Sequence, residues 1–270
     1  MSLHLQRIAV LGGTGFVGRS VCEHLVRAGA AAVIVPTRKL PHAQHLRTLP
    51  SVDVRQADVH DDHALRRLLL GCDAVINLVA ILHGSAAEFD RVHVALPRRL
   101  AQACKSLGIE RVVHVSALGA SDDAPSAYLR SKAGGERSLR EAGLRLTVLR
   151  PSVIFGAHDQ LLNLFAALQR WFPVMPLAGA NARLQPVWVE DVAAAIVASL
   201  EQPASIGKVI QCAGPEVLSL ADLVRAAGRY DTTRQVLVDN MPSQAGRPGY
   251  RVLTPFRRDD SDTLLLVDRG

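Results

Sequence analysis

Three glycines at three-residue intervals, placed directly after an apolar run, constrain this chain more than any other feature. Residues 7 to 11 read Arg-Ile-Ala-Val-Leu, and Gly12, Gly15 and Gly18 follow in the segment Gly-Gly-Thr-Gly-Phe-Val-Gly. The apolar run predicts a buried strand, and apolar residues at helical spacing over 16–28 predict a helix. A strand that passes through glycines straight into a helix begins a βαβ unit.

The same alternation continues through the first 150 residues. Further strands are expected at 33–35, 52–56, 73–79, 111–115 and 145–149, with helices at 61–70, 88–107 and 126–142. Glycine stands after the last turn of each helix, at 29, 71, 108 and 143, where its left-handed conformation turns the chain out of the helix. We therefore expect an α/β fold with a doubly wound, mainly parallel sheet of the Rossmann type.

A glycine turn in this context predicts a site for a dinucleotide. Gly12 permits the tight turn, Gly15 lets the backbone approach a pyrophosphate, and Gly18 lets the helix pack closely on the sheet. The free amides of the helix N-terminus then face the anion. A plain strand-to-helix turn is the alternative. The NAD(P) contacts expected from this turn are Gly12, Thr14, Gly15, Phe16, Val17 and Gly18.

The end of the second strand bears on which dinucleotide is bound. NAD-selective sites usually carry an Asp or Glu there, whereas this chain has Thr37, Arg38 and Lys39. The planar guanidinium of Arg38 suits a 2′-phosphate, and Lys39 adds positive charge. We therefore predict NADP, with NAD as the alternative if Arg38 and Lys39 are only solvated loop charges.

Three residues form a candidate catalytic set. Tyr128 and Lys132 lie four residues apart on the helix expected at 126–142, so they share one face. Ser116 follows the strand at 111–115, at the carboxyl edge where parallel strands form the ligand crevice. Reduction of a carbonyl by NADPH needs a proton, and a phenol with a pKa near ~10 exchanges it poorly at neutral pH. We expect Lys132 to lower the pKa of Tyr128, and Ser116 to hydrogen-bond the substrate oxygen.

The glycine turn, Ser116, the Tyr128 to Lys132 spacing and Pro151 together resemble the extended or atypical branch of the short-chain dehydrogenase/reductase superfamily, over residues 7 to about 228. The resemblance implies three cofactor-binding segments, beside the adenine, under its ribose and beside the nicotinamide. Lys132 is expected to reach the nicotinamide ribose. The segments are, in that order, Asp58 and Val59; Asn77, Leu78 and Val79; and Pro151, Ser152 and Val153.

A closer likeness is carried by residues 115–118, 128–133, 151–156 and 185–189. These segments are similar to the epimerase/dehydratase-like family of the NADPH-binding accessory subunit of mitochondrial respiratory complex I and its stand-alone bacterial relatives. The likeness implies tight NADPH holding with a structural or quinone-associated role. One position departs from the wider superfamily, since His93 stands where many extended members carry an asparagine that helps to order the site.

Composition limits the partners. The net charge is +6, but the basic residues are scattered, so we expect no nucleic acid and instead phosphorylated ligands or an anionic membrane surface. Apolar stretches fall short of the ~20 residues of a membrane helix, and a signal-peptide pattern is missing. Four isolated cysteines, at 22, 72, 104 and 212, predict reduced thiols and no metal site. We expect a cytoplasmic protein, or one peripheral to the inner face of the membrane.

Two functions remain open at this point. The chain is either an NADP-dependent oxidoreductase or epimerase acting on a small carbonyl or quinone, or a binding module that keeps NADPH as a structural ligand in a respiratory complex. Arg183 keeps a third option, a nucleotide-sugar epimerase, in which an arginine binds the diphosphate. Whether the chain turns over a substrate is left undecided.

Pro151 ends the regular alternation, and the elements beyond it are sparser. We expect a helix near 160–171, a short strand near 185–189, a helix at 192–200 capped by Asp191, a strand at 207–211 on the sheet edge and a helix at 219–228. Three parts are predicted. They are a dinucleotide-binding Rossmann core at 1–150, a smaller C-terminal lobe at 151–230, and a tail at 231–270 to which the sequence assigns no structure.

Overall fold

The computed structural model describes residues 6–157, 159 and 181–220, together with the strand backbones at 236–242, 248–257 and 264–268. The chain divides into two compact units, the first made of residues 1–156 with 185–215 and the second of residues 157–184 with 216–270. The segment 185–215 thus returns to the first unit after the chain has left it. The boundaries at 150 and 230 between the core, the lobe and the tail stay predictions.

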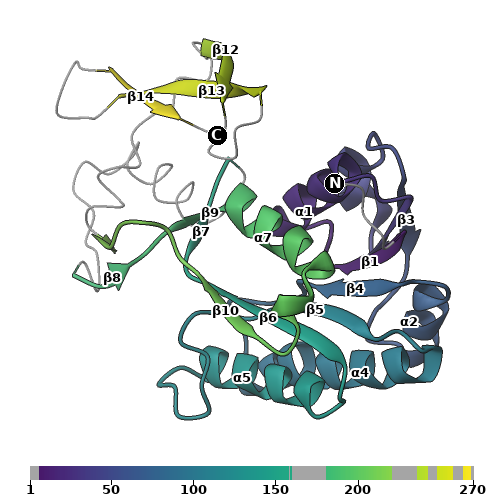
Figure 1. Ribbon diagram of the computed structural model, residues 1–270. Helices are drawn as coiled ribbons and strands as arrows, with labels where there is room; N and C mark the ends of the chain where they lie inside the picture. Colours follow the sequence, from purple (N-terminus) through teal and green to yellow (C-terminus); the bar gives the residue numbers. More distant parts are fainter. Residues whose placement is uncertain are drawn as a thin grey trace. The chain divides into compact units, whose positions relative to one another are not determined.

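The first unit contains a seven-stranded sheet in the order β10-β6-β5-β4-β1-β2-β3 (Figure 1). Every neighbouring pair in it is parallel. The strand order reverses between β1 and β4, which is the switch point where doubly wound sheets bind their ligands. The predicted doubly wound α/β fold is confirmed. The strands are β1 (Arg7–Leu11), β2 (Ala32–Thr37), β3 (Val52–Gln56), β4 (Ala74–Asn77), β5 (Arg111–Val115), β6 (Arg145–Pro151) and β10 (Val209–Cys212).

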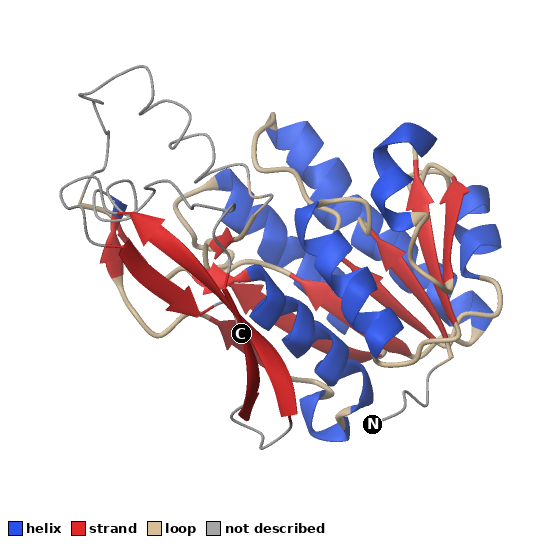
Figure 2. Ribbon diagram, turned by 90° about the horizontal axis from the view of Figure 1, so that it is seen from above, coloured by secondary structure: helices blue, strands red, loops and turns tan. Residues whose placement is uncertain are grey.

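Helices cover both faces of this sheet (Figure 2). Residues of α1 and α7 join one apolar core with Ile8 and Val10 of β1, whereas residues of α2, α4 and α5 join a second core with Ala9 and Leu11 of the same strand. Strands buried on both faces explain the continuous apolar runs. The helices are α1 (Phe16–Arg27), α2 (Asp62–Leu69), α3 (Ala86–Phe89), α4 (Leu96–Leu107), α5 (Ala127–Arg140) and α7 (Val189–Glu201), with the 3₁₀ turns η1 (Leu40–Leu46) and η3 (Pro203–Ser205).

The four glycines expected after helices do have left-handed backbones, with φ between 70° and 88° at Gly29, Gly71, Gly108 and Gly143. These four residues explain why the sequence placed the helix ends in the first unit well.

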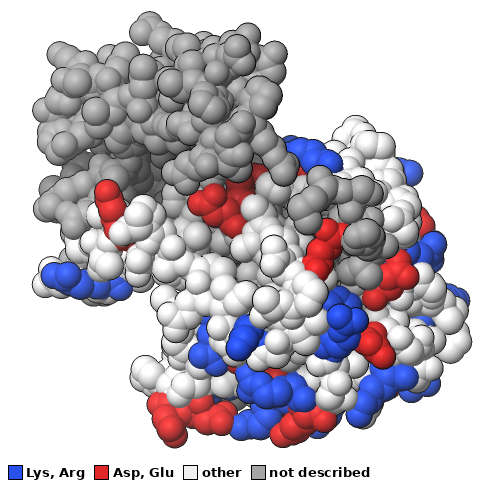
Figure 3. Space-filling view, in the orientation of Figure 1, with Lys and Arg blue, Asp and Glu red and all other residues white. Residues whose placement is uncertain are grey.

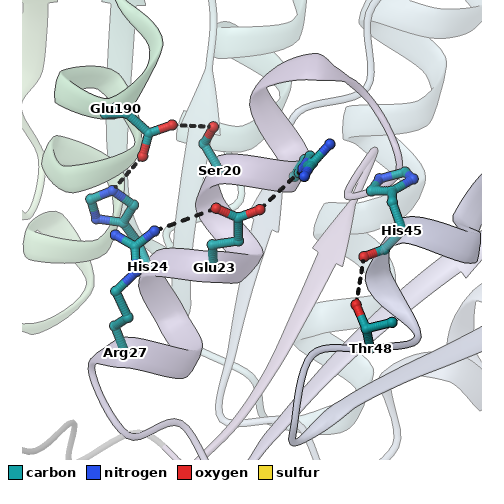
Figure 4. A network of polar contacts seen from close by, with 8 residues as sticks. Ser20, Glu23, His24, Arg27, His45, Thr48 and Glu190 are labelled. Atoms are coloured by element: carbon teal, nitrogen blue, oxygen red, sulfur yellow. Dashed lines mark hydrogen bonds and ion pairs between the residues drawn. The ribbon is translucent and has the colours of Figure 1, made fainter. Parts of the chain in front are cut away.

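Polar contacts join α1 to α7 on one face of the sheet (Figure 4). Glu190 accepts a hydrogen bond from the Ser20 hydroxyl at 2.7 Å and lies 2.9 Å from Nε2 of His24. These contacts lower the pKa of the Glu190 carboxyl. Glu190 comes from a segment more than 160 residues further along the chain, so the network ties the returning segment to the first helix.

The single helix predicted over 88–107 is wrong, because a π-helical turn, η2 (Asp90–Ala95), separates α3 from α4. The Leu96 amide donates to the carbonyl of Arg91, five residues earlier. Pro97 has no amide hydrogen, so it cannot donate to the His93 carbonyl as a regular helix would require. The missing donor explains why the wider turn forms at this point.

Two expectations beyond Pro151 are also corrected. The helix expected to be capped by Asp191 begins earlier, at Val189, and its N-cap residue Trp188 makes no side-chain capping hydrogen bond. The strand expected at 185–189 is shortened to β9 (Val187–Trp188), which pairs in parallel with β7 (Ile154–Phe155). The helix expected at 160–171 and nearly all of that expected at 219–228 lie outside the described residues.

The second unit contains strands that the sequence did not indicate. β8 (Arg183–Leu184) pairs antiparallel with β11 (Leu218–Ser219). In the tail, to which the sequence assigns no structure, β12 (Val236–Pro242), β13 (Pro248–Arg257) and β14 (Leu264–Asp268) form an antiparallel sheet.

Among the described residues, the surface charge, the cysteines and the lengths of the helices bear on whether the chain has a binding face, a reactive thiol or a membrane span. On the face shown in Figure 3, basic and acidic side chains lie side by side. The four cysteines are free, and burial raises the pKa of the Cys22 thiol to about 12. Among the helices that the structure describes, none is long and apolar enough to span a bilayer.

Gly135 of α5 packs against the π-helical turn, where a Cβ would lie 2.1 Å from the His93 carbonyl oxygen. We expect Gly135→Ala to lower the free energy of unfolding by about 1–3 kcal/mol, because a backbone atom cannot yield. Urea denaturation of the wild type and the variant measures this difference in the free energy of unfolding.

Gly134→Ala is the matched control for Gly135→Ala. Its nearest contact would be a side-chain atom, Cγ2 of Val94 at 3.0 Å, and the better helix propensity of alanine, worth about 1 kcal/mol, offsets that contact. Equal stability losses in the two variants would contradict this account of the packing.

Candidate cofactor and catalytic site

The glycine turn and the segment after β4 meet at the carboxyl edge of the sheet. A Cβ on Gly12, whose φ is 83°, would lie 3.1 Å from the carbonyl carbon of Leu78 and 3.1 Å from the amide nitrogen of Val79. The Leu78 amide donates to the Leu11 carbonyl at 2.9 Å. Asn77 accepts a hydrogen bond from the Val79 amide at 3.2 Å. The structure thus brings together two of the predicted cofactor segments.

The start of α1 has the form of a diphosphate cradle. A Cβ on Gly18 would lie 2.3 Å from the Gly12 carbonyl oxygen, so only glycine lets the helix lie against the turn. Gly15 is the N-cap, makes no side-chain cap, and no acidic residue occupies the first turn of α1. The amides of that turn therefore suit an anion. Phe16 packs near Gly156, where a Cβ would lie 3.2 Å from the ring.

Hydrogen bonds hold the backbone of the turn after β2, and the side chain of Arg38 in this turn is exposed. The Thr37 hydroxyl donates to the Lys39 carbonyl at 3.0 Å and accepts from the Lys39 amide at 3.3 Å. Gln56 of β3 donates to the carbonyl of Arg38 at 3.4 Å. Within the described ranges, no carboxylate forms an ion pair with the Arg38 guanidinium. This corner therefore offers positive charge to a phosphate.

Asp58 and its neighbours, after β3, share that corner. The Asp58 carboxylate accepts from the His60 amide at 3.0 Å, and the Ala57 amide donates to the Thr37 carbonyl at 3.0 Å. Burial lowers the pKa of His60; Asp58 opposes this effect, while Arg38 and other arginines add to it. Arg38 therefore lies near His60, which directly follows the segment predicted to face the adenine.

Ser116 lies at the carboxyl end of β5 with its side chain buried. Its hydroxyl has no hydrogen-bond partner among the described residues, although an unpaired buried polar group is costly. The backbone around it is fixed, because the Ser116 amide donates to Leu149 at 2.7 Å and the Leu118 amide donates to Pro151 at 2.9 Å. Ser116 therefore lies beside the segment that begins at Pro151.

Lys132 is the largest fully buried side chain of the described core. Its ammonium donates to the Val115 carbonyl at 2.8 Å, one residue before Ser116. Burial lowers the pKa of Lys132 to about 8, and Glu136, one helical turn on, opposes that shift. Glu136 itself is held by Arg150 of β6 through two contacts, at 2.9 and 2.8 Å.

Tyr128 lies one turn before Lys132 on α5 and is half-buried. Burial raises the pKa of its phenol, which is opposite to the expected lowering by Lys132. The reason is that desolvation disfavours the phenolate, while the ammonium of Lys132 lies against the carbonyl of Val115.

The ring of Tyr128 packs in an aromatic cluster that the sequence did not reveal. His93 of η2 lies edge-on to it with ring centroids 5.4 Å apart, and Phe89 lies 6.0 Å from it. Sequence reasoning noticed His93 only as a departure and missed Phe89, Ser131 and His114. Pro97 inside an apparent helix was the available signal, because it marks a break where side chains change direction.

His114, on β5 two residues before Ser116, is buried. Nδ2 of Asn77 lies 3.2 Å from Nδ1 of His114. Because Asn77 Oδ1 accepts from Val79, its amide nitrogen faces the ring and His114 Nδ1 accepts. Burial, with Lys132 and His93 nearby, keeps the pKa of His114 well below its ordinary value. The second ring nitrogen has no partner in the part of the chain that the structure describes.

The sequence model of the NAD dependent epimerase/dehydratase family matches residues 8–213, which includes the glycine turn, Ser116, Tyr128 and Lys132. The chain belongs to this family. A second match, to the SURF1 family, covers residues 181–270. The strands β12 to β14 lie within this second match and beyond residue 213, where the epimerase/dehydratase match ends.

Curated relatives are similar to most of this chain. Subunit 9 of the NADH dehydrogenase [ubiquinone] 1 alpha subcomplex of Mus musculus is 38% identical over 223 residues, which are 80% of this chain and 59% of that protein. The ceramide reductase of Caulobacter vibrioides is 34% identical over 198 residues, which are 73% of this chain and 61% of the relative. The chain therefore spans about three fifths of the length of these relatives.

A solved structure with the same fold is UDP-glucuronic acid 4-epimerase from Bacillus cereus in complex with UDP-glucuronic acid and NAD. It is 22% identical to this chain, covers 80% of each chain and has a TM-score of 0.71. The family match shows that this chain is an NAD(P)-binding protein of the epimerase/dehydratase type, and the structural likeness supports the fold.

The buried histidine of η2 predicts a pH dependence of stability. Burial lowers the pKa of His93 to about 4, and Lys132 of α5 adds to the effect. In the unfolded chain an ordinary histidine has a pKa of about 6.5. Between these values the unfolded state holds more protons, so the free energy of unfolding falls as the pH falls from about 6.5 toward about 4.

Urea denaturation at several pH values tests this dependence. We expect His93→Gln to weaken it, while His114 of β5, whose pKa burial also lowers, keeps part of it in place. His83→Gln, at an exposed position in the loop after β4, is the control. An unchanged pH slope in His93→Gln would show that His93 is not held neutral.

Proposed function

We propose that this chain binds NADPH and reduces the carbonyl group of a small molecule, with Ser116, Tyr128 and Lys132 as its catalytic residues. One observation carries the proposal: the Ser116 hydroxyl is buried and unpaired within the described residues, immediately after the carbonyl that holds the Lys132 ammonium. An unpaired donor at the carboxyl edge of a parallel sheet suits an oxygen of a bound substrate.

Each residue then has a separate task. A reduced nicotinamide bound beside these residues would supply the hydride for the carbonyl carbon. Ser116 donates a hydrogen bond to the carbonyl oxygen, and Tyr128 gives that oxygen its proton. Lys132 has further N–H donors besides the one that binds Val115, and its positive charge stabilises the phenolate that Tyr128 leaves behind.

The protonation states favour reduction over oxidation. Burial raises the pKa of Tyr128, so the phenol keeps its proton at neutral pH. Lys132, with a pKa of about 8, is mostly charged at neutral pH. Oxidation of an alcohol needs the phenolate instead, which burial disfavours. We therefore infer that the carbonyl is the substrate and the alcohol the product.

For the cofactor we propose NADP over NAD, with contacts from the glycine turn, Asp58, Val59, Asn77, Leu78, Val79 and the segment at 151–153. The preference is supported by the exposed Arg38 and Lys39 at the end of β2 and by the absence of a carboxylate at 37–39. Thr37 holds this turn through two hydrogen bonds with Lys39, which suits a fixed phosphate site.

Arg38→Ala tests the cofactor preference. Loss of one charge-assisted contact costs about 1.5–3 kcal/mol, so we expect the Kd for NADPH to rise by about tenfold to a hundredfold, with little change in the Kd for NADH. Fluorescence titration of each dinucleotide measures both constants. Arg47→Ala, at another exposed arginine, is the control. Equal Kd values for NADPH and NADH in the wild type would refute the preference.

Tyr128→Phe tests the chemistry. We expect the wild type to oxidise NADPH steadily with at least one member of a panel of aldehydes, ketones and quinones. The variant should lose about a hundredfold or more in kcat while still binding NADPH, because only the proton donor is removed. Full turnover in Tyr128→Phe would exclude the phenol as the proton donor.

Ser116→Ala gives an independent check on the same site. It removes a buried hydroxyl that pairs with no described residue, so we expect lower kcat without lower stability.

A second function, a module that holds NADPH without turnover, is favoured by different observations. The mouse relative is named as a subunit of an NADH dehydrogenase. The raised pKa of Tyr128 also makes its phenol a weaker acid, which slows proton transfer to a carbonyl oxygen. In that case the protein docks in a respiratory assembly, in the cytoplasm at the inner face of the membrane. Slow NADPH release, with no turnover of any panel member, would select the module.

A further inference from the structure

The buried imidazole of His93 connects the three elements around Tyr128. Phe89, the last residue of α3, stacks on the ring with centroids 5.5 Å apart and planes 21° apart. Tyr128 of α5 meets the ring edge-on, at 5.4 Å and 83°. Phe89 and Tyr128 also contact each other edge-on. Each of the three rings therefore touches the other two.

The ring nitrogens of His93 continue the connection on both sides. The Ile81 amide donates to Nε2 at 3.1 Å, so Nε2 carries no hydrogen and the neutral ring is protonated at Nδ1. Nδ1 lies 2.8 Å from the Ser131 hydroxyl and donates to it. Ser131 in turn donates to the Tyr128 carbonyl at 2.7 Å. An unbroken chain of hydrogen bonds thus runs from the loop after β4 to the backbone of Tyr128.

The backbone of η2 holds His93 where these contacts meet. Pro97 cannot donate to the His93 carbonyl, and Gly135 of α5 packs so closely on that carbonyl that a Cβ would lie 2.1 Å from it. The π-helical turn therefore serves to bring one imidazole between α5 and the loop that follows β4.

We propose that His93 is a positioning residue for Tyr128. It fixes the phenol through ring packing and through Ser131, and it ties Tyr128 to Ile81, two residues after the cofactor segment that ends at Val79. This inference rests on the proposed catalytic use of Tyr128. His93 uses both nitrogens for contacts within the chain, so it acts through Tyr128 and does not carry the reaction's proton.

Steady-state kinetics of four variants test the proposal. His93→Phe keeps a flat ring and removes both nitrogens, and His93→Gln removes the ring. We expect kcat to fall about tenfold to a hundredfold in both, because a small displacement of a reacting group has that cost. The KM for NADPH should change little.

Two serines on α5 supply a matched pair for the same measurement. Ser131→Ala breaks the contact between His93 and the Tyr128 carbonyl and should lower kcat in the same direction. Ser138 donates to the Gly134 carbonyl of its own helix at 3.0 Å, so Ser138→Ala removes a similar hydrogen bond away from His93 and should leave kcat unchanged. Wild-type kcat in His93→Phe and in Ser131→Ala would overturn the proposal.

A titration of the Tyr128 phenol separates this proposal from the proposed function. The ultraviolet absorbance of each variant is compared with that of the same variant carrying Tyr128→Phe, which isolates one phenol without any turnover. We expect His93→Gln and Ser131→Ala to lower the phenol's pKa from its raised value toward the ordinary one, with Ser138→Ala unchanged.

The outcomes are distinguishable. If the wild type turns over no substrate but the two variants still show the lowered pKa of the phenol, the proposed reaction is contradicted. His93 then remains the residue that positions Tyr128. A phenol that titrates identically in the wild type, His93→Gln and Ser131→Ala overturns the positioning role, whatever the kinetics.

Discussion

The arrangement of the site depends on one buried charge. Lys132 places an ammonium inside the protein, where desolvation would be prohibitive without polar partners. The Val115 carbonyl accepts from it at 2.8 Å, and Glu136, bound twice by Arg150, supplies the opposite charge one turn away. These contacts fix the rotation of α5 against β5 and β6. Because Tyr128 lies one turn earlier on the same face, its position at the carboxyl edge follows from the same contacts.

Much of this fold could be predicted because its signals are local. Apolar runs marked the strands, and glycines at 29, 71, 108 and 143 marked helix ends with left-handed backbones. The π-helical turn could not be predicted in the same way, since it depends on a carbonyl that Pro97 leaves without a donor and on the close approach of Gly135. The strands of the tail were missed because their partners are other strands of the tail, and pairing between strands leaves little trace in composition.

In the candidate site too, the features carried by short segments could be predicted, and the features that depend on contacts between distant segments could not. The spacing of Tyr128 and Lys132 and the glycine turn are contained in short segments, so they were evident from the sequence. The pKa of Tyr128 was predicted in the wrong direction, because the effect of a neighbouring charge was weighed without the burial that the folded chain imposes. The contacts of His93 with Phe89 and Ser131 join residues on three elements, and a single sequence carries no signal for such a meeting.

The return of residues 185–215 to the first unit has a consequence for synthesis on the ribosome. β10 pairs with β6, and the Cys212 carbonyl accepts from the Ser152 amide at 2.9 Å. α7 supplies Val192 and Ile196 to the core on one face of the sheet. A nascent chain that has emerged only as far as β6 therefore has one sheet face covered by α1 but not yet by α7, and an open strand edge at β6. The first unit can close only after the chain beyond β10 has left the exit tunnel, so the intervening residues emerge before the unit they interrupt is complete.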